Sequence, residues 1–207
     1  MKGLIFDIET NGFLADLTKV HCLAVREAEG DAEIKIYGGV TDEGIRNALS
    51  HLEDAECLIG HNVMDFDISA LKKVYPAFKP RGKVFDTLLA SQLIWTDLFD
   101  HDMTFRRKNP DFPGNLMGRH KLKAWGYRLG VLKGKVEGVG EEKWYEKWTP
   151  ELAAYCMQDV KVTKAFLDLI ESKHYSQQAL DLEHEFKEYM IDQEREGLPF
   201  DEESAKA

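Results

Sequence analysis

The sequence has little cysteine, little proline and no long apolar run. Of its 207 residues, three are cysteine and six are proline. Cys22, Cys57 and Cys156 lie far apart and form no CxxC pair, so we expect buried, reduced thiols rather than a disulfide framework. No apolar run reaches the roughly 20 residues that a membrane-spanning helix needs, and the N-terminus becomes acidic too early for a signal peptide. These absences predict a cytoplasmic protein without a membrane partner.

Basic residues are scarce over most of the chain. The formal net charge is −10, which by itself disfavours nucleic acid as a partner. Residues 72–135, however, carry 14 Lys or Arg against 5 Asp or Glu. A basic segment beside acids that bind cations suits a protein that holds a phosphate backbone. The alternative is a solvated charge imbalance that serves no partner.

Hydrophobic residues, at 43%, suffice for one packed domain with a peripheral extension. Patterning and turn signals predict strands over residues 2–6, 20–26, 33–37, 56–60 and 84–85. Apolar spacing, with Thr41 and Thr149 as caps, predicts helices over residues 42–52, 66–74, 87–95, 121–129, 149–172 and 180–195. Residues 97–118 and 134–140 are expected to be surface loops. Three strands in a meander, then alternating helices and strands, indicate an α/β fold with a mixed sheet.

Two acids follow the first predicted strand. Asp7 and Glu9, in FDIETNG, are two residues apart and therefore point to the same side of a strand. Two neighbouring carboxylates repel each other unless a cation lies between them, and oxygen ligands suit a hard metal ion. An exposed strand edge that happens to carry two acids is the alternative.

Further acids lie at helical positions. Asp67, in GHNVMDFDISAL, follows a buried strand at the start of a helix, where capping is the alternative role; Asp65 is a second candidate there. Tyr155 and Asp159 are four apart and share one helix face, with a packed tyrosine and a surface acid as the alternative. The apolar residues of that helix are expected to be buried: Val160, Val162, Phe166 and Leu167. Four carboxylates from three elements match what two divalent cations need, about 3.5–4 Å apart, to cleave a phosphodiester.

These segments resemble the exonuclease domain of family A DNA polymerases from short-tailed bacteriophages, within the DnaQ-like, or DEDD, superfamily. FDIETNG resembles the first exonuclease motif, HNVMDFD the second and YCMQD the third. FDTLLASQLIW, HKLKAWGYRLG and EHEFKEYMIDQEREGLPFD also resemble phage polymerase segments, so the similarity covers nearly the whole chain. It implies an RNase H-like fold with about five strands, and a DNA-proofreading 3′→5′ exonuclease in the cytoplasm of a bacterial host.

The resemblance also implies roles for individual residues. Asp7, Glu9 and Asp159 would hold one Mg²⁺ or Mn²⁺ ion, and Asp7 would bridge to a second ion that Asp67 contacts directly or through water. Tyr155, which places the chain in the DEDDy group, would orient the attacking water. The 3′ end of single-stranded DNA would contact five residues: Thr10, Phe13, Asn62, Phe66 and His120. For the two phenylalanines, core packing is the alternative.

One departure concerns length, because family A polymerases continue for hundreds of residues and this sequence stops at Ala207. We expect an exonuclease domain over residues 1–175, and over residues 176–207 a C-terminal helix and the start of a link to a polymerase domain. An excised domain, a truncated product and the exonuclease half of a split polymerase, with a separate polymerase chain as partner, all remain open. The sequence itself lacks the residues for polymerase activity.

Basic residues in the middle of the chain are candidates for guiding the strand, with a solvated charge run as the alternative: Arg106, Arg107, Lys108, Arg119, His120 and Lys121. Trp144, Tyr145 and Trp148 are expected to pack rather than bind. Two rival functions remain open. One is an RNA 3′-end-trimming ribonuclease of the same superfamily, and the other is a non-catalytic module that binds single strands or a polymerase.

Overall fold

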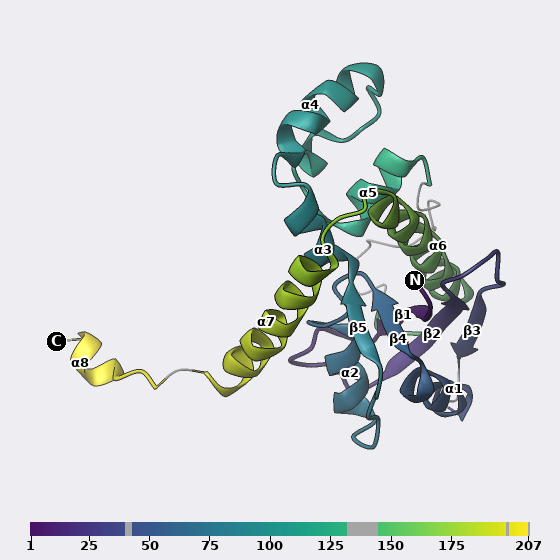
Figure 1. The fold of residues 1–207 in the computed structure, drawn as a ribbon. Coiled ribbons are helices and arrows are strands. Elements are labelled where there is room, and N and C mark those ends of the chain that lie inside the picture. The colour runs from purple at the N-terminus through teal and green to yellow at the C-terminus, as the bar shows by residue number, and fades with distance from the viewer. Residues whose placement is uncertain (40–42, 132–144, 198, 207) are drawn as a thin grey trace.

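A computed structural model describes residues 1–39, 43–131, 145–197 and 199–206. Five strands form one mixed sheet in the order β3-β2-β1-β4-β5 (Figure 1). Their bounds are β1 Leu4–Thr10, β2 Val20–Glu27, β3 Lys35–Gly38, β4 Cys57–Gly60 and β5 Lys83–Asp86. β1, β2 and β3 are antiparallel neighbours, whereas β4 is parallel to β1 and to β5. The mixed α/β sheet expected from the sequence is confirmed.

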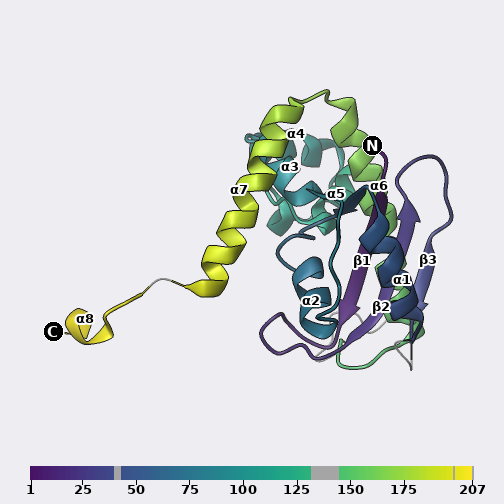
Figure 2. The ribbon, with the colours of Figure 1, turned by 60° about the horizontal axis from the view of Figure 1, so that its bottom comes forward.

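Helices cover both faces of this sheet (Figure 2). Their bounds are α1 Glu43–Asp54, α2 Asp67–Val74, α3 Thr87–Ile94, α4 Leu98–Lys108, α5 Leu122–Leu129, α6 Pro150–Ser172, α7 Gln177–Glu196 and α8 Glu202–Lys206. Phe6 and Ile8 of β1 pack with α1 and α2, whereas Ile5 packs with α3, α5 and α6. Because side chains alternate along a strand, Asp7 and Glu9 share the phase of Ile5 and face α6.

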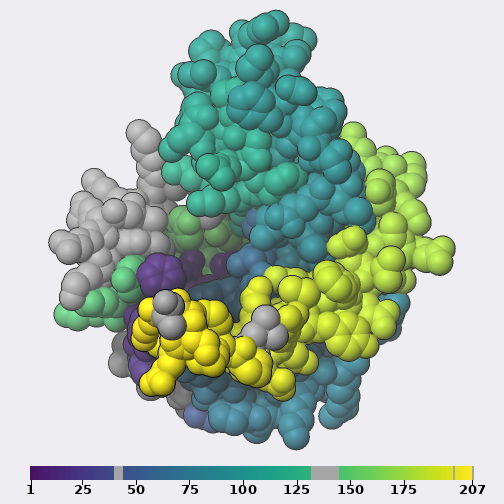
Figure 3. Space-filling view, turned by 90° about the vertical axis from the view of Figure 1, so that its left-hand side faces the viewer, coloured from purple at the N-terminus to yellow at the C-terminus, as the bar shows by residue number. Residues whose placement is uncertain are grey.

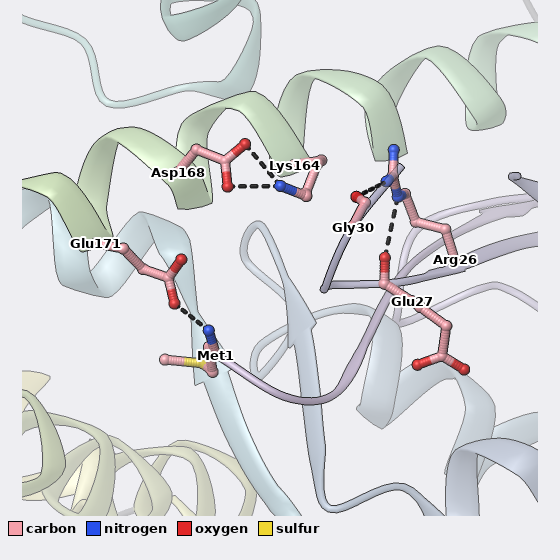
Figure 4. Close-up of polar contacts among 7 residues, drawn as sticks. All are labelled: Met1, Arg26, Glu27, Gly30, Lys164, Asp168 and Glu171. Carbon is pink, nitrogen blue, oxygen red and sulfur yellow. Dashed lines mark hydrogen bonds and ion pairs between the residues drawn. The ribbon is translucent and has the colours of Figure 1, made fainter. Parts of the chain in front are cut away.

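Helix α6 begins where the sequence predicts. Thr149 caps it by accepting a hydrogen bond from the N–H of Leu152, at 3.1 Å. The helix runs antiparallel to β1. The N-terminal ammonium of Met1 pairs with Glu171 in its last turn (Figure 4), and the thiol of Cys156 in its second turn donates to the Asp7 carbonyl oxygen, at 3.3 Å. The acidic end of β1 therefore lies against the first turns of α6. The predicted buried face is confirmed: Val160, Val162, Phe166 and Leu167.

The expectation of a loop over residues 97–118 is wrong, because this segment contains α4 and a short 3-10 turn. α4 buries only Leu98 and Asp102, and it leaves Phe99 55% exposed. Leu98 joins the core on the α6 side and Phe105 packs near Phe112. A polar contact adds to these, since Arg128 of α5 donates to both carboxylate oxygens of Asp102, at 2.9 and 2.7 Å. Hydrophobic periodicity cannot predict a helix that is held in this way.

Helix α7 packs beside β5 at the edge of the sheet, and α8 lies away from the rest of the chain (Figure 1). Leu180 of α7 joins the core on the α6 side of the sheet, and Ile191 contacts the core on the α1 side.

The domain boundary predicted after residue 175 falls between α6 and α7 and stays a prediction. Three sequence predictions lie outside the described residues: the Thr41 cap, the loop over residues 134–140 and the packing of Trp144. None of the described helices has the length and apolar character to cross a bilayer.

Candidate active site

Three of the four predicted carboxylates converge at the carboxyl end of β1. Asp7 and Glu9 come from the strand, and Asp159 comes from the third turn of α6. One carboxylate oxygen of each residue lies within 4.8 Å of the other two. Asp159 is buried, and the other two are half-buried. Because negative groups this close repel each other in poorly hydrated surroundings, the cluster fits a hard divalent cation with oxygen ligands.

Asp67 approaches β1 from the start of α2. β1 pairs with β4 through Leu4 and Ile5. Farther along β1, the N–H of Ile8 donates to Oδ1 of Asp67 at 3.1 Å. The capping alternative is therefore wrong, since Asp67 is the first residue of α2 and its carboxylate bonds to another element. Burial, together with the charge of Asp7, raises the pKa of Asp67 above its usual value. A cation beside these two carboxylates would offset both effects.

The loop that joins β4 to α2 carries Asn62 and Phe66. Asn62 has a left-handed φ of 64°, which asparagine tolerates better than most residues, and its carbonyl accepts the Phe66 N–H at 3.1 Å. Both side chains are half-buried, and Phe66 packs partly against the core on the α1 side. Asp65 pairs with Lys187 of α7 at 2.7 Å. Of the two acids in this loop region, Asp67 alone is hydrogen-bonded to β1.

Asp86, which the sequence analysis did not single out, organises this loop. Its buried carboxylate accepts the N–H groups of Asn62, Met64 and Leu88 at 2.8, 3.1 and 2.9 Å. Burial raises the pKa of Asp86, and these hydrogen bonds act in the opposite direction. Its own N–H donates to Nε2 of His184 on α7, at 2.8 Å. An acid between a strand and a helix, as in FDTLL, is typical of an N-cap, but the pattern does not indicate which loop the acid also binds.

Thr10 and Phe13 occupy different environments just beyond β1. Thr10 is buried, and its hydroxyl donates to the Gly12 carbonyl at 2.8 Å, which stabilises the turn after the strand. Phe13 is 72% exposed, and its ring centroid lies 6.0 Å from that of Tyr145. The core-packing alternative for Phe13 is therefore wrong. Trp148 packs against the core on the α6 side, as expected.

A hollowed face of the molecule exposes atoms of the N-terminal segment beside the start of α6 (Figure 3). In the space-filling view, purple atoms of the N-terminal segment and green atoms of the chain near the start of α6 are visible inside a hollow, and the teal α4 region rises beside it (Figure 3). The segments that carry the acids thus remain accessible from a face that the basic middle of the chain borders.

Sequence comparison supports the resemblance that the motifs suggest. No family model matches the chain. The sequence is 33% identical to the DNA-directed DNA polymerases of Enterobacteria phage T3 and Escherichia phage T7, in alignments that cover 96% of this chain and 33% of each polymerase. The predicted similarity to phage DNA polymerases is confirmed. The chain spans about one third of the length of these relatives.

Solved structures share the fold. An apo nuclease superimposes with a TM-score of 0.60, at 20% identity, over 94% of this chain and 84% of that one. Brucella melitensis NrnC with bound Mg²⁺ gives 0.57 at 17% identity, over 96% and 90%. E. coli Exonuclease I in complex with a dT13 oligonucleotide gives 0.51 at 15% identity, over 81% and 40%. The fold is that of the RNase H-like exonucleases.

In this exonuclease fold, the basic candidates lie on and after α4. His120 is half-buried, with Nδ1 2.9 Å from the Ser91 hydroxyl oxygen. Burial and the charge of Arg128 lower its pKa, so the imidazole is mostly neutral at pH 7. Arg106 donates from Nε to the Phe112 carbonyl at 3.2 Å, which ties it to local structure. The other four candidates are exposed: Arg107, Lys108, Arg119 and Lys121.

Proposed function

We propose that the chain is a two-metal-ion 3′→5′ exonuclease that shortens single-stranded or frayed DNA and releases nucleoside 5′-monophosphates, as in proofreading. The observation that carries this proposal is the convergence of Asp7, Glu9 and Asp159 within 4.8 Å, with Asp67 hydrogen-bonded to the same strand. The similarity to two phage DNA polymerases supports a DNA substrate. The fold shared with an exonuclease bound to an oligonucleotide supports the reaction class.

The carboxylates divide into two ligand sets. Asp7, Glu9 and Asp159 would hold one Mg²⁺ or Mn²⁺ ion, and Asp7 with Asp67 would hold the other. Two such ions, when bound, supply an activated water and neutralise charge on the leaving 3′ oxygen. The protein positions the ligands through its main chain, because Cys156 joins α6 to β1 and the Ile8 N–H joins β1 to α2. Ligands held in advance need little rearrangement when substrate arrives.

Other side chains would orient the reactants. Tyr155 lies one turn before Asp159 on α6, from where its hydroxyl would hold a water in line with the scissile bond. The water oxygen forms the new bond to phosphorus, the bond from phosphorus to the 3′ oxygen breaks, and a proton goes to that oxygen. The exposed ring of Phe13 would stack on a base, while Asn62 and Phe66 contact the terminal nucleotides. Strand entry requires unpairing, which costs a few kcal/mol, so frayed ends are favoured.

The decisive experiment is an assay on 3′-labelled single-stranded DNA, with a 5′-labelled strand as the control for direction. We expect Mn²⁺-dependent release of labelled mononucleotide from the 3′ end and a ladder from the 5′-labelled strand. Asp7→Asn with Glu9→Gln should abolish both signals and leave a folded protein by circular dichroism. Unchanged hydrolysis in that variant, or in excess EDTA, would contradict the proposal.

Matched DNA and RNA strands separate the proposed activity from RNA 3′-end trimming. Metal-phosphate chemistry does not discriminate at the 2′ position. The ratio of kcat/KM for DNA to kcat/KM for RNA therefore distinguishes the two activities. We expect DNA to be preferred, because the curated relatives are DNA polymerases. We also propose that a polymerase domain or chain is a partner, which a pull-down with a phage polymerase fragment would test. We further propose that the chain acts in the cytoplasm of a bacterial host, which cell fractionation would test.

A further inference from the structure

The loop over residues 61–66 presents two proposed substrate contacts and leads directly into Asp67. Its path is tight, because a Cβ atom added at Gly60 would lie 2.7 Å from Cβ of Val63. Asn62 adopts a left-handed conformation, with φ at 64°. A conformation of this kind persists where surrounding contacts over-determine it. The contacts that hold this loop therefore help to build the site.

Those contacts come from the junction of β5 and α3. Asp86 accepts the N–H groups of Asn62 and Met64, at 2.8 and 3.1 Å, and that of Leu88 in the first turn of α3, at 2.9 Å. The adjacent Thr87 hydroxyl donates to the last carbonyl of β4, at 3.1 Å. Two of the three hydrogen bonds to the Asp86 carboxylate thus come from the loop. Capping of α3 explains only the third, which comes from Leu88.

We propose that Asp86 is a positioning residue for the exonuclease reaction, and this inference rests on the proposed function. It fixes the loop conformation that presents Asn62 and Phe66 to the terminal nucleotide and Asp67 to a metal ion. An ionised carboxylate suits this role because both of its oxygens are acceptors, whereas an amide places a donor on one side. Hydrogen bonds to a charged acceptor are also stronger than those between neutral groups.

Two substitutions at this position separate loop positioning from helix capping. Asp86→Ser retains a good N-cap for the Leu88 N–H, but a single short hydroxyl cannot also accept from Asn62 and Met64. Asp86→Asn retains one oxygen and turns an NH₂ group toward an N–H donor. A matched control for lost stability is Leu52→Ala, because Leu52 is fully buried in α1 and its truncation leaves a cavity without removing a hydrogen bond to the loop.

The experiment measures hydrolysis of 3′-labelled single-stranded DNA against Mn²⁺ concentration, at a temperature well below the Tm of every variant. We expect Asp86→Ser to lower kcat/KM by about 10-fold to 100-fold, as misplacement of reacting groups does, and to raise the Mn²⁺ concentration for half-maximal rate. Asp86→Asn should fall between Asp86→Ser and the wild type. Leu52→Ala should match the wild type in both quantities, since lost stability alone does not change them in a folded protein.

Two other outcomes would overturn the positioning role and the proposed function, respectively. If Asp86→Ser matched Leu52→Ala in kcat/KM and in Mn²⁺ requirement, Asp86 would be a structural residue and the positioning role would be overturned. If the wild type itself showed no Mn²⁺-dependent hydrolysis, the proposed function would be overturned instead, and the positioning role with it. Should Asp86→Ser fail to fold, Asp86→Asn decides by the same two measurements.

Discussion

The carboxylate of Asp67 accepts the main-chain N–H of Ile8 at 3.1 Å. This bond joins the second acidic segment to the strand that carries the first. Ile8 lies between Asp7 and Glu9 in the sequence. Its main-chain N–H therefore fixes where the Asp67 carboxylate lies relative to those two acids. The bond also holds a carboxylate close to Asp7 although burial and that charge both disfavour its ionised form. A cation bound beside the two carboxylates would relieve this unfavourable electrostatics.

Divalent cations should stabilise the fold through the acidic cluster. We expect saturating Mn²⁺, at about 100 times its Kd, to add about 2.7 kcal/mol to the free energy of unfolding, which in a chain of this size raises Tm by roughly 5–10 °C. Asp159→Asn should lose most of this increase. The matched control is Asp65→Asn, which removes an acid that pairs with Lys187 instead. Thermal unfolding in Mn²⁺ and in EDTA measures the effect, and an equal shift in Asp159→Asn would exclude it as a ligand.

Phe13 should contribute to strand binding and little to stability. The residue is 72% exposed, so Phe13→Ala is expected to leave Tm nearly unchanged. Stacking of a base on an aromatic ring contributes about 1–3 kcal/mol, and we expect a loss of that size in binding of single-stranded DNA, measured by fluorescence anisotropy in Ca²⁺. Phe186→Ala on α7, where the ring is 58% exposed, is the control. Equal binding by both variants would show that Phe13 does not stack on the strand.

The ion pair between Asp102 and Arg128 should be important for the attachment of α4. The two side chains are 2% and 8% exposed, so Arg128→Met leaves a buried carboxylate without its partner, which typically costs about 3–5 kcal/mol. Replacing both residues, in Asp102→Leu with Arg128→Met, should cost less than the single change. Urea denaturation measures the free energy of unfolding in each variant.

A surface pair serves as the control for that measurement. Nζ of Lys164 lies 2.5 and 2.6 Å from the two carboxylate oxygens of Asp168 on α6 (Figure 4), and the side chains are 18% and 55% exposed. Exposed pairs contribute about 0–1 kcal/mol, so Lys164→Met should change the free energy of unfolding little. A similar small loss for Arg128→Met would mean that α4 does not depend on its buried pair.

His120 should make the stability of the fold depend on pH in the acidic range. Burial and the nearby Arg128 charge lower its pKa below the ordinary value of 6.5, so between 6.5 and the folded-state pKa the unfolded chain binds more protons than the folded one. The free energy of unfolding therefore falls as pH drops through this window, and the contribution of His120 is fully present above pH 6.5. His120→Asn should flatten the slope in urea titrations at several pH values. His21, whose pKa burial also lowers, contributes a slope in the same direction, whereas the raised pKa values of Asp67 and Asp86 contribute in the opposite direction. An unchanged slope in His120→Asn would contradict the shift at His120.

Much of this architecture follows from local sequence signals. The meander, the cap at Thr149 and the buried face of α6 were predictable because alternation, capping residues and helical periodicity agree along the chain. The acidic pair on β1 was predictable for the same reason, since two residues apart in a strand means the same face. α4 has no apolar stripe to signal a helix, because its two buried residues are Leu98 and Asp102 and the second is held by an ion pair with Arg128. The loop contacts of Asp86 were missed because they join segments more than 20 residues apart, and such pairings have no local signature.

The imidazole of His184 links α7 to this loop through two successive hydrogen bonds. Because Nε2 accepts the Asp86 N–H, Nδ1 carries the proton and donates to the Leu180 carbonyl within α7, at 2.7 Å. Asp86 in turn accepts the Asn62 N–H. A domain or chain that tilted α7 would therefore shift the loop over residues 61–66 through His184 and through the ion pair between Lys187 and Asp65, and it would change the rate of the proposed reaction without contacting the acidic cluster.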